Sequence, residues 1–239
     1  AEIAALEFSS MPRVDDCPRF GFPVAGIPKI VAIGQNYMNH ILEMGYTPPE
    51  EPVIFIKAIS SLTGPNDPMI KPKTSTKFDY EVEMAALIGS TAINVSEEDA
   101  LNHVAGYAIM NDGSERAFQR ERSGGTTKGK SADTFGPLGP WLVTAGEFGD
   151  PQAKRIWTRV NGEDRQNGNT SDMVFGVARL ISYVSEFMSL NPGDVLTTGS
   201  PHGVAAGFDP PKWLQVGDII EMGIDGLGEQ RHEVVVSPN

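Results

Sequence analysis

Two acidic residues, one residue apart, lead directly into an apolar run. Glu81 and Glu83 lie in the segment FDYEVEMAALIG, residues 78–89. In a β-strand, residues two apart project to the same face, so the two carboxylates are expected to point together, with Cβ atoms about 7 Å apart. Burying two like charges this close is unfavourable unless a cation is shared between them. Oxygen ligands suit Mg²⁺, Mn²⁺ or Ca²⁺ rather than a structural zinc.

Such an ion needs a third ligand, and Asp112 is the candidate. It follows the apolar stretch 105–110, a predicted strand, so it lies at a strand end where a neighbouring strand can bring it beside the pair. Three carboxylates would leave about three octahedral positions open for water and substrate. The alternative is a solvated strand face that carries two ordinary acids, and the local sequence leaves both interpretations open.

A histidine and a glutamate occur together in the segment GQNYMNHILEMG. His40 and Glu43 are three positions apart, which places them on one face of a predicted helix. A histidine held by a carboxylate can act as a general base on water; alternatively, Glu43 is the base and His40 orients it. The segment alone is also compatible with a surface histidine beside a surface glutamate.

Cationic and polar side chains follow the proposed third ligand. Arg116 and Gln119 are three positions apart, and an arginine fork there suits a substrate carboxylate. Lys128 and Lys130 lie in a glycine-rich loop, where a desolvated lysine can stabilise an oxyanion, although such a lysine can equally be exposed. Ser200 and the backbone amides of TTGSPHGV can bind a carboxylate. This turn lacks the GxGxxG and Walker patterns, so nucleotide binding is not predicted.

Short strands and turns have to position these side chains. Strands are predicted at residues 30–33, 53–56, 80–88, 105–110, 156–160, 195–198 and 219–224. The Asn161-Gly162 pair after the fifth of these strands predicts a hairpin. No repeat or low-complexity tract is present. The pattern therefore predicts a mixed α/β domain that consists mainly of β-strands.

Helices are fewer in the predicted domain. They are expected at 36–44, at 114–122, and at 173–190, where apolar residues recur at helical spacing. Ser171 or Asp172 is expected to cap the long helix, and its apolar stripe indicates ordinary core packing. A further helix is expected to start with Ser96 as N-cap and to continue through 100–104.

Composition limits the class of protein. The 239 residues include 40% hydrophobic and 21% charged side chains, as in ordinary soluble proteins. No apolar run approaches the ~18 residues that a membrane span needs, and the N-terminus lacks the pattern of a secretory signal. The net charge of −12 disfavours nucleic-acid binding. The single cysteine, Cys17, excludes an intramolecular disulfide and suits a reducing compartment, so a cytoplasmic protein is expected.

Residues 1–29 differ from the rest of the chain. They contain Pro12, Pro18, Pro23 and Pro28, and they are expected to form a lead-in or the remnant of a truncated small domain. Residues 30–239 are expected to form one catalytic domain, because no break in composition divides them further.

The order of eight segments resembles the fumarylacetoacetate hydrolase family over residues 29–236. These segments are IGQNYMNHILEMG, FIKAISSLTGP, DYEVEMAALIG, VAGYAIMNDGSERAFQ, KGKSADTFGPLGPWLVT, VNGEDRQNGNTSDMVFG, LNPGDVLTTGSPHGV and VGDIIEMGIDGLG. Each segment is a weak signal by itself, whereas the ordered combination is highly specific.

The resemblance implies a β-roll with a few short helices and one long amphipathic helix, assembled as a homodimer. It implies Mg²⁺ or Mn²⁺ bound by Glu81, Glu83 and Asp112. The implied catalytic residues are His40, Glu43 and Lys130. The implied substrate-binding residues are Tyr37, Lys57, Arg116, Gln119 and Ser200.

Three positions depart from the family pattern. Ser200 stands where a threonine is usual, so the hydroxyl is retained. Gln35 replaces the more frequent leucine or arginine, and His202 follows the turn where a smaller or different residue is common. Both lie near the expected pocket, so they bear on the identity of the substrate.

The chemistry that the resemblance implies is hydrolytic cleavage of a carbon–carbon bond in an acylpyruvate, a 2,4-diketo acid. The sequence is most similar to hydrolases of 2,4-diketo-3-deoxy sugar acids such as L-2,4-diketo-3-deoxyrhamnonate, which yield pyruvate and L-lactate. Fumarylpyruvate hydrolysis, oxaloacetate decarboxylation and 2-keto-4-enoate hydration on the same scaffold remain alternatives. So does a non-catalytic module that keeps a structural ion.

Overall fold

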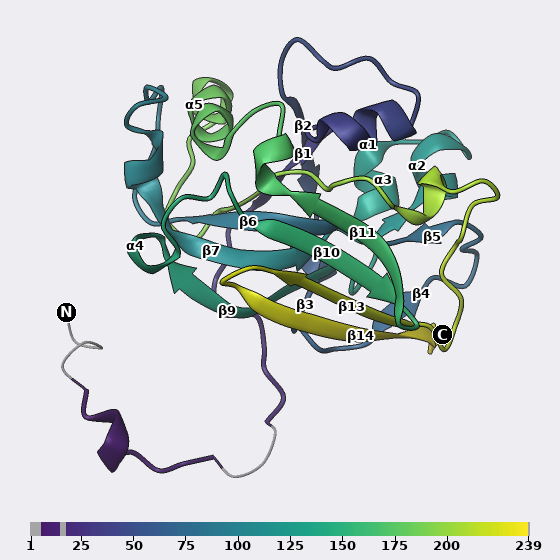
Figure 1. The fold of residues 1–239 in the computed structure, drawn as a ribbon, viewed down its shortest axis with the longest axis horizontal. Coiled ribbons are helices and arrows are strands. Elements are labelled where there is room, and N and C mark those ends of the chain that lie inside the picture. Colours follow the sequence, from purple (N-terminus) through teal and green to yellow (C-terminus); the bar gives the residue numbers. More distant parts are fainter. Residues whose placement is uncertain (1–5, 15–17, 239) are drawn as a thin grey trace.

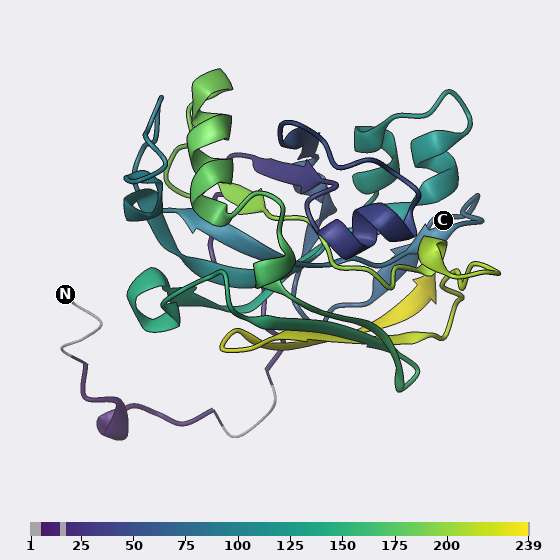
Figure 2. The same ribbon diagram turned by 45° about the horizontal axis from the view of Figure 1, so that its top comes forward.

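The computed structural model describes residues 6–14 and 18–238, so Cys17 lies outside the described residues. Two large sheets curl around a shared core, and a short two-stranded sheet lies beside them (Figures 1 and 2). The mainly β fold class with few helices is therefore confirmed. Among the described residues, none of the helices is long and apolar enough to cross a membrane.

The seven-stranded sheet carries the most deeply buried strands. In spatial order it contains β2 (Val53–Lys57), β1 (Ile30–Gly34), β12 (Val195–Thr197), β6 (Val82–Ile88), β7 (Val104–Asn111), β9 (Gly136–Thr144) and β3 (Leu62–Thr63). All seven residues of β6 are buried. A strand covered on both faces is expected to be almost continuously apolar, as β6 is apart from Glu83.

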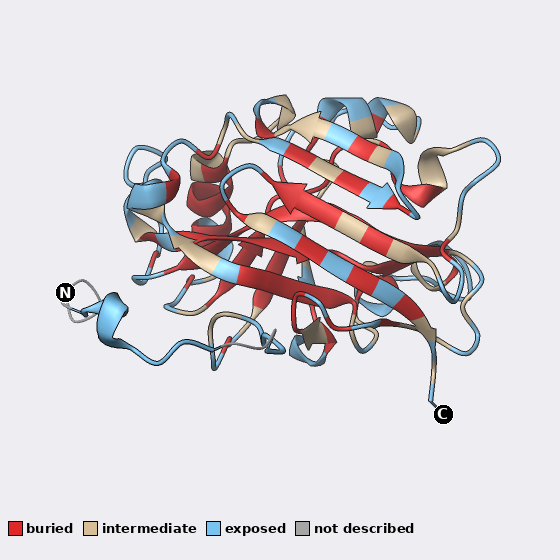
Figure 3. Cartoon of the chain, turned by 60° about the horizontal axis from the view of Figure 1, so that its bottom comes forward, coloured by how far each residue is buried: buried red, intermediate tan, exposed pale blue. Residues whose placement is uncertain are grey.

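The five-stranded sheet shows the opposite pattern of burial. In spatial order it contains β11 (Glu163–Asn169), β10 (Arg155–Val160), β13 (Ile219–Ile224), β14 (Gly228–Val236) and β4 (Met69–Lys71). Buried and exposed residues alternate along β14, because one face of this sheet packs on the core and the other meets solvent (Figure 3). The small third sheet pairs β5 (Phe78–Asp79) with β8 (Ser114–Glu115).

The helices are short and lie around the sheets. The α-helices are α1 (Met38–Glu43), α2 (Arg116–Arg120), α3 (Thr126–Lys130), α4 (Ala145–Phe148) and α5 (Val177–Phe187). Single 3₁₀ turns are η2 (Phe8–Ser10), η3 (Ile59–Ser61), η4 (Ala100–His103), η5 (Thr170–Asp172) and η6 (Ala205–Gly207). The predicted hairpin at Asn161-Gly162 is confirmed, because this pair joins β10 to β11 with a positive φ at both residues.

The long helix α5 begins later and ends earlier than predicted. Met173 forms an isolated β-bridge with Tyr37, so the residues before the helix are extended. Gly176 is the N-cap, and the Gln152 side chain accepts the Val177 amide at 2.8 Å, so the predicted caps Ser171 and Asp172 were wrong. At the other end, Leu190 pairs with Ala92, which again requires extended backbone.

Two other helix predictions and one loop prediction need correction. Ser96 closes a turn by accepting the Asp99 amide at 3.1 Å, and only the 3₁₀ turn η4 follows, because β7 begins at Val104. The helix predicted at 114–122 starts at Arg116, because the two residues before it pair with β5. The predicted glycine-rich loop with Lys128 and Lys130 is the helix α3.

The segment before the first strand is tied to the sheets near its end. Arg19 forms a two-pronged ion pair with Asp67, with contacts of 2.6 and 2.5 Å, and Ile27 is buried. Residues 6–14 lie apart from the sheets in Figures 1 and 2. The division into a lead-in, 1–29, and a catalytic domain, 30–239, stays a prediction.

Candidate active site

Three carboxylates meet where β6 begins and β7 ends. The antiparallel register pairs Glu83 with Met110, and the ladder continues beyond the strands, since the Asp112 amide donates to the Glu81 carbonyl at 2.8 Å. One oxygen from each of Glu81, Glu83 and Asp112 lies within 4.8 Å of the others, and all three residues are buried. Two adjacent antiparallel strands therefore bring together acids that are far apart in the sequence.

Buried cations surround the three carboxylates. Lys130 forms ion pairs with both Glu81 and Asp112. Lys57 lies fully buried behind the site, with its ammonium 2.5 Å from Asp112 Oδ1. Arg116 donates to Glu81 through Nη2. Each of these contacts is charge-assisted, so the carboxylates are held in fixed orientations.

The three carboxylates do not share this positive charge equally. Burial alone would raise the pKa of Glu81, but Arg116 and Lys130 hold it well below its ordinary range. Burial, together with the negative charge of Asp112, raises the pKa of Glu83 to about 8. Three buried carboxylate ligands fit a hard divalent cation such as Mg²⁺ or Mn²⁺. Such an ion would also supply the positive charge that Glu83 lacks from its neighbours.

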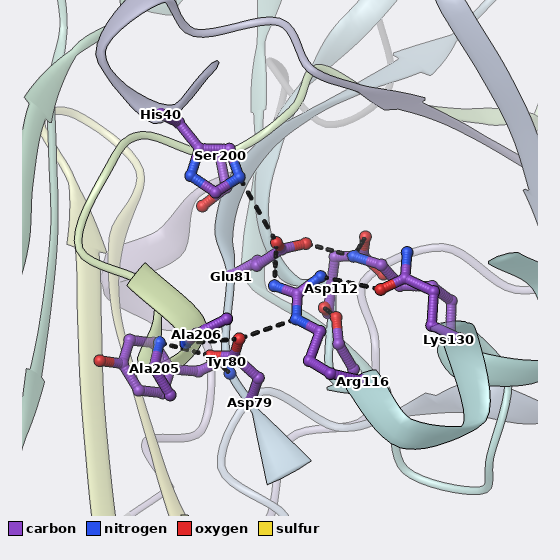
Figure 4. A network of polar contacts seen from close by, with 12 residues as sticks. His40, Asp79, Tyr80, Glu81, Asp112, Arg116, Lys130, Ser200, Ala205 and Ala206 are labelled. Atoms are coloured by element: carbon purple, nitrogen blue, oxygen red, sulfur yellow. Dashed lines mark hydrogen bonds and ion pairs between the residues drawn. The ribbon is translucent and has the colours of Figure 1, made fainter. Parts of the chain in front are cut away.

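A cavity of about 270 Å³ opens beside these carboxylates. Its lining includes six further side chains that the sequence singled out: Gln35, His40, Arg116, Gln119, Lys130 and Ser200. Figure 4 shows His40 and Ser200 on one side of Glu81 and Lys130 on the other. The structure thus places acid–base and cationic groups around one space.

His40 and Glu43 form a pair at the edge of this cavity. The Nδ1 atom of His40 lies 3.1 Å from Glu43 Oε2, and its Nε2 atom lies 4.0 Å from Glu81 Oε1. The imidazole therefore stands between the two carboxylates. Glu43 itself does not line the cavity; its other oxygen accepts the Gly203 amide at 2.8 Å.

The remaining predicted site residues differ in their access to the cavity. Ser200 donates to the Val82 carbonyl at 2.9 Å and is almost fully buried. Tyr37 is fully buried and, like Lys57, is not among the cavity-lining residues. Lys128 is exposed and donates to the Arg122 carbonyl. The substrate-binding roles of Tyr37, Lys57 and Ser200 stay predictions.

Two polar residues at the site were not predicted from the sequence. Asp79 is fully buried and accepts Arg116 Nε at 2.8 Å. Its signal was present, because Asp79, Glu81 and Glu83 continue the same spacing of two. Arg120 lines the cavity, stacks 5.9 Å from the Tyr46 ring and makes no ion pair with any other described residue.

The comparisons with known proteins agree with this geometry. The family model described as "Fumarylacetoacetate (FAA) hydrolase C-terminal" matches residues 29–235. The chain therefore belongs to the fumarylacetoacetate hydrolase family, and the resemblance found in the sequence is confirmed.

Among similar proteins is 2,4-didehydro-3-deoxy-L-rhamnonate hydrolase of Sphingomonas sp. (strain SKA58), 52% identical over 235 residues, which cover 98% of this chain and 82% of that protein. Fumarylacetoacetate hydrolase from psychrophilic Exiguobacterium antarcticum superposes with a TM-score of 0.89 at 39% identity, covering 97% of this chain and 83% of that one. Fumarylpyruvate hydrolase from Pseudomonas aeruginosa in complex with Mn²⁺ and pyruvate gives 0.81 at 30% identity, covering 94% and 100%.

Proposed function

We propose that this protein is a divalent-metal-dependent hydrolase that cleaves a carbon–carbon bond of a 2,4-diketo acid. The substrate that the relatives favour is 2,4-diketo-3-deoxy-L-rhamnonate, and its products are pyruvate and L-lactate. The observation that carries the proposal is the convergence of three buried carboxylates, within 4.8 Å of one another, on a cavity that His40 and Lys130 also line. The Sphingomonas relative at 52% identity supports the choice of substrate.

Glu81, Glu83 and Asp112 would hold Mg²⁺ or Mn²⁺. A bound dication acts as a Lewis acid toward a 2-oxo acid and its enolate. The chain contributes the fixed carboxylate positions, because Arg116, Lys57 and Lys130 hold the oxygens by ion pairs. The crystallised fumarylpyruvate hydrolase, in complex with Mn²⁺ and pyruvate, supports both the ion and a pyruvate-containing substrate.

His40 is the better placed of the two candidate bases. Its Nε2 atom faces the carboxylate cluster, whereas Glu43 contacts Nδ1 on the other side of the ring. A base must lie within hydrogen-bonding reach of the proton that it takes. We therefore assign to His40 the proton from the attacking water, and to Glu43 the task of orienting the ring and stabilising its charged form.

Lys130 supplies positive charge beside the carbon that water attacks. Burial alone would lower its pKa, but Asp112 and Glu81 raise it above its ordinary value, so the side chain stays an ammonium. A buried, fixed cation stabilises the negative oxygen that forms when water adds to the 4-oxo carbon. The C3–C4 bond then breaks, the carbon that leaves as pyruvate takes a proton, and the other fragment leaves as a carboxylic acid.

The polar lining of the cavity suits a substrate with hydroxyl groups. Gln35 lines the cavity with a φ of 52°, and its side-chain amide has no hydrogen bond to any other described residue. A non-glycine residue in this conformation is strained, and such residues concentrate at functional sites. Arg120 and Thr126 also line the cavity. These polar groups are suited to bind the hydroxylated end of a deoxy sugar acid.

The test is to incubate the protein with Mg²⁺ or Mn²⁺ and a panel of substrates, following pyruvate release. The panel contains 2,4-diketo-3-deoxy-L-rhamnonate, fumarylpyruvate, a 2-keto-4-enoate and oxaloacetate. Hydrolysis gives two acids, decarboxylation gives CO₂, and hydration leaves the carbon count unchanged. EDTA is expected to abolish turnover and excess Mg²⁺ to restore it.

Turnover of oxaloacetate alone would replace the proposed reaction by decarboxylation. An absence of turnover on the whole panel, despite measurable Mn²⁺ binding, would favour a binding module. Assembly as a homodimer stays a prediction that sedimentation of the purified protein tests.

A further inference from the structure

Asp79 connects two parts of the site that come from distant segments. It is fully buried at the end of β5, two residues before Glu81. One of its oxygens accepts the Ala205 amide at 2.7 Å, and the other accepts Arg116 Nε at 2.8 Å and the Ala206 amide at 3.2 Å (Figure 4). It does not line the cavity, so its role has to act through these partners.

The first connection leads to the metal-binding carboxylates. Arg116 donates to Asp79 through Nε and to Glu81 through Nη2, while Nη1 donates to Gln119 at 3.1 Å. A planar guanidinium with each of its three nitrogens bonded has a single orientation. Asp79 thus fixes the guanidinium that holds Glu81.

The second connection leads to the acid–base pair. Asp79 and Tyr80 both bond to the backbone of loop 203–207. Asp79 accepts the Ala205 amide, and the Tyr80 hydroxyl donates to the Gly203 carbonyl at 3.0 Å. The Gly203 amide in turn donates to Glu43 Oε1 at 2.8 Å. Since the other oxygen of Glu43 faces His40, the loop determines where the imidazole lies.

Two glycines make the contact between this loop and Glu43 possible. Gly203 has a φ of 96°, and a Cβ there would lie 1.9 Å from the carbonyl oxygen of Arg165. A Cβ at Gly207 would lie 2.3 Å from the carboxyl carbon of Glu43. A side chain at Gly207 would therefore collide with the Glu43 carboxylate. A side chain at Gly203 would collide with the Arg165 carbonyl and so displace the backbone whose amide donates to Glu43.

We propose that Asp79 is a positioning residue that couples the His40–Glu43 pair to the metal-binding carboxylates. Through Arg116 it holds Glu81, and through loop 203–207 it holds Glu43. Helix α1 has only six residues and a single buried one, so its own packing fixes it weakly. The proposal rests on the proposed function, because both ends of the connection act in that reaction.

The principal test is the Asp79→Asn variant. In either orientation its NH₂ group would face two N–H donors, Arg116 Nε with the Ala206 amide or the amides of Ala205 and Tyr80. The loss of the negative charge weakens the remaining bonds, while the side-chain volume is kept. We expect kcat to fall about 100-fold, as for a displacement of about 1 Å in a catalytic group, with KM changed by less than about threefold. Mn²⁺ affinity is expected to fall about tenfold, because Arg116 holds the ligand Glu81 less firmly. Hydrogen exchange is expected to accelerate in α1 and in loop 203–207, but not in β6.

A second pair of variants isolates the loop and does not depend on whether Asp79→Asn folds. Gly203→Ala and Gly217→Ala both place a side chain at a similar φ, 96° and 94°, but Gly217 has no atom within 4 Å of the added Cβ. Both share the backbone strain, and only Gly203→Ala displaces the Glu43 contact. We expect faster exchange in α1 and lower kcat for Gly203→Ala alone.

Wild-type kcat in Asp79→Asn, or α1 exchange equal in the two glycine variants, would overturn the proposal. Because hydrogen exchange and Mn²⁺ binding are measured without substrate, they test the coupling even if the wild-type protein hydrolyses none of the diketo acids. Failure of the proposed reaction is therefore distinguishable from failure of the coupling.

Discussion

Both large sheets bury polar side chains, but they do so in different ways. In the seven-stranded sheet, Glu83 lies among charged groups, and the negative charge of Asp112 contributes to its raised pKa. In the five-stranded sheet, β14 buries Gln230 and His232. Gln230 donates to the carbonyls of Ile109 and Gly139, at 2.9 and 3.0 Å, and so links this sheet to β7 and β9.

The contrast separates a structural role from a chemical one. Neutral polar groups that bond to buried carbonyls stabilise the packing of one sheet on the other. Like charges gathered at one point oppose folding, and they persist where a ligand or a reaction needs them. We therefore expect substitutions in the carboxylate cluster to affect activity, and substitutions of the buried polar residues of β14 to affect stability.

The largest effect is expected for Glu83→Ala. Loss of one ligand should weaken Mn²⁺ binding and lower kcat/KM for pyruvate release by about 10³-fold or more, since a bound ion supplies several kcal/mol of stabilisation. Without metal, the free energy of unfolding should change by no more than about 1 kcal/mol, because relief of the like-charge repulsion offsets the loss of the acceptor for the Gly199 amide. Calorimetry measures Mn²⁺ binding and unfolding, and steady-state kinetics measure kcat/KM.

Glu229→Ala is the matched control, because Glu229 is an exposed carboxylate of β14. It should leave Mn²⁺ binding, kcat/KM and the free energy of unfolding unchanged. If Glu83→Ala instead unfolded the protein and retained turnover in the folded fraction, the carboxylates would be structural.

Gln230→Ala should show the reverse separation. Two buried carbonyls lose their donor, so the free energy of unfolding should fall by about 2–6 kcal/mol, at about 1–3 kcal/mol per unsatisfied group. Chemical denaturation measures this loss. Wild-type kcat is expected, because Gln230 does not line the cavity. A large loss of kcat with unchanged stability would contradict the distinction between the sheets.

The parts of the site that follow from local spacing could be predicted from the sequence. The period of two in Glu81 and Glu83, and the position of Asp112 after an apolar strand, predicted that the three carboxylates meet, and they do because β6 and β7 are antiparallel neighbours. Local spacing left open whether they bind an ion, and only the family resemblance favoured that role. The proximity of His40 and Glu43 followed in the same way from helical spacing.

Features set by distant partners could not be predicted. The start of α5 depends on the bridge between Met173 and Tyr37, and the role of Asp79 depends on amides more than a hundred positions later in the chain. Local sequence also did not separate Lys128 from Lys130. Burial against the carboxylates distinguishes these lysines, and it becomes visible only when α3 is placed in the fold.

A smaller, pH-dependent effect is expected from His232. Its Nδ1 and Nε2 atoms face oxygens of Asp67 and Gln230, each at 3.1 Å, and a neutral ring can donate to only one of them. Burial lowers the pKa of His232 to about 4, against about 6.5 in the unfolded chain. The unfolded state therefore binds more protons between these values, so stability falls as the pH drops below 6.5.

The expected loss from this group between pH 8 and pH 5 is about 2 kcal/mol. Denaturation of the wild type and of His232→Gln across this range isolates it, since the variant should lack this part of the pH dependence. If the wild type instead became more stable relative to His232→Gln as the pH falls, the ring would be held as a cation between its two oxygens.

The smallest effect is expected at the Asn161-Gly162 turn, far from the carboxylates in the sequence. Asn161 has a φ of 52°, accepts the Ile219 amide at 2.9 Å and donates to Asp218 at 2.9 Å. Asn161→Ala should cost about 1–2 kcal/mol, from the left-handed strain and the lost hydrogen bonds, with kcat unchanged.

Asn161→Gly separates the two causes, because glycine adopts the left-handed conformation without strain but cannot form the side-chain bonds. If the conformation dominates, the glycine variant should retain most of the wild-type stability; if the hydrogen bonds dominate, both variants should lose the same amount. In either case the substitution lowers the free energy of unfolding and leaves kcat unchanged. A loss of kcat in either variant would show instead that the five-stranded sheet transmits strain to the site, and the separation between the two sheets would fail.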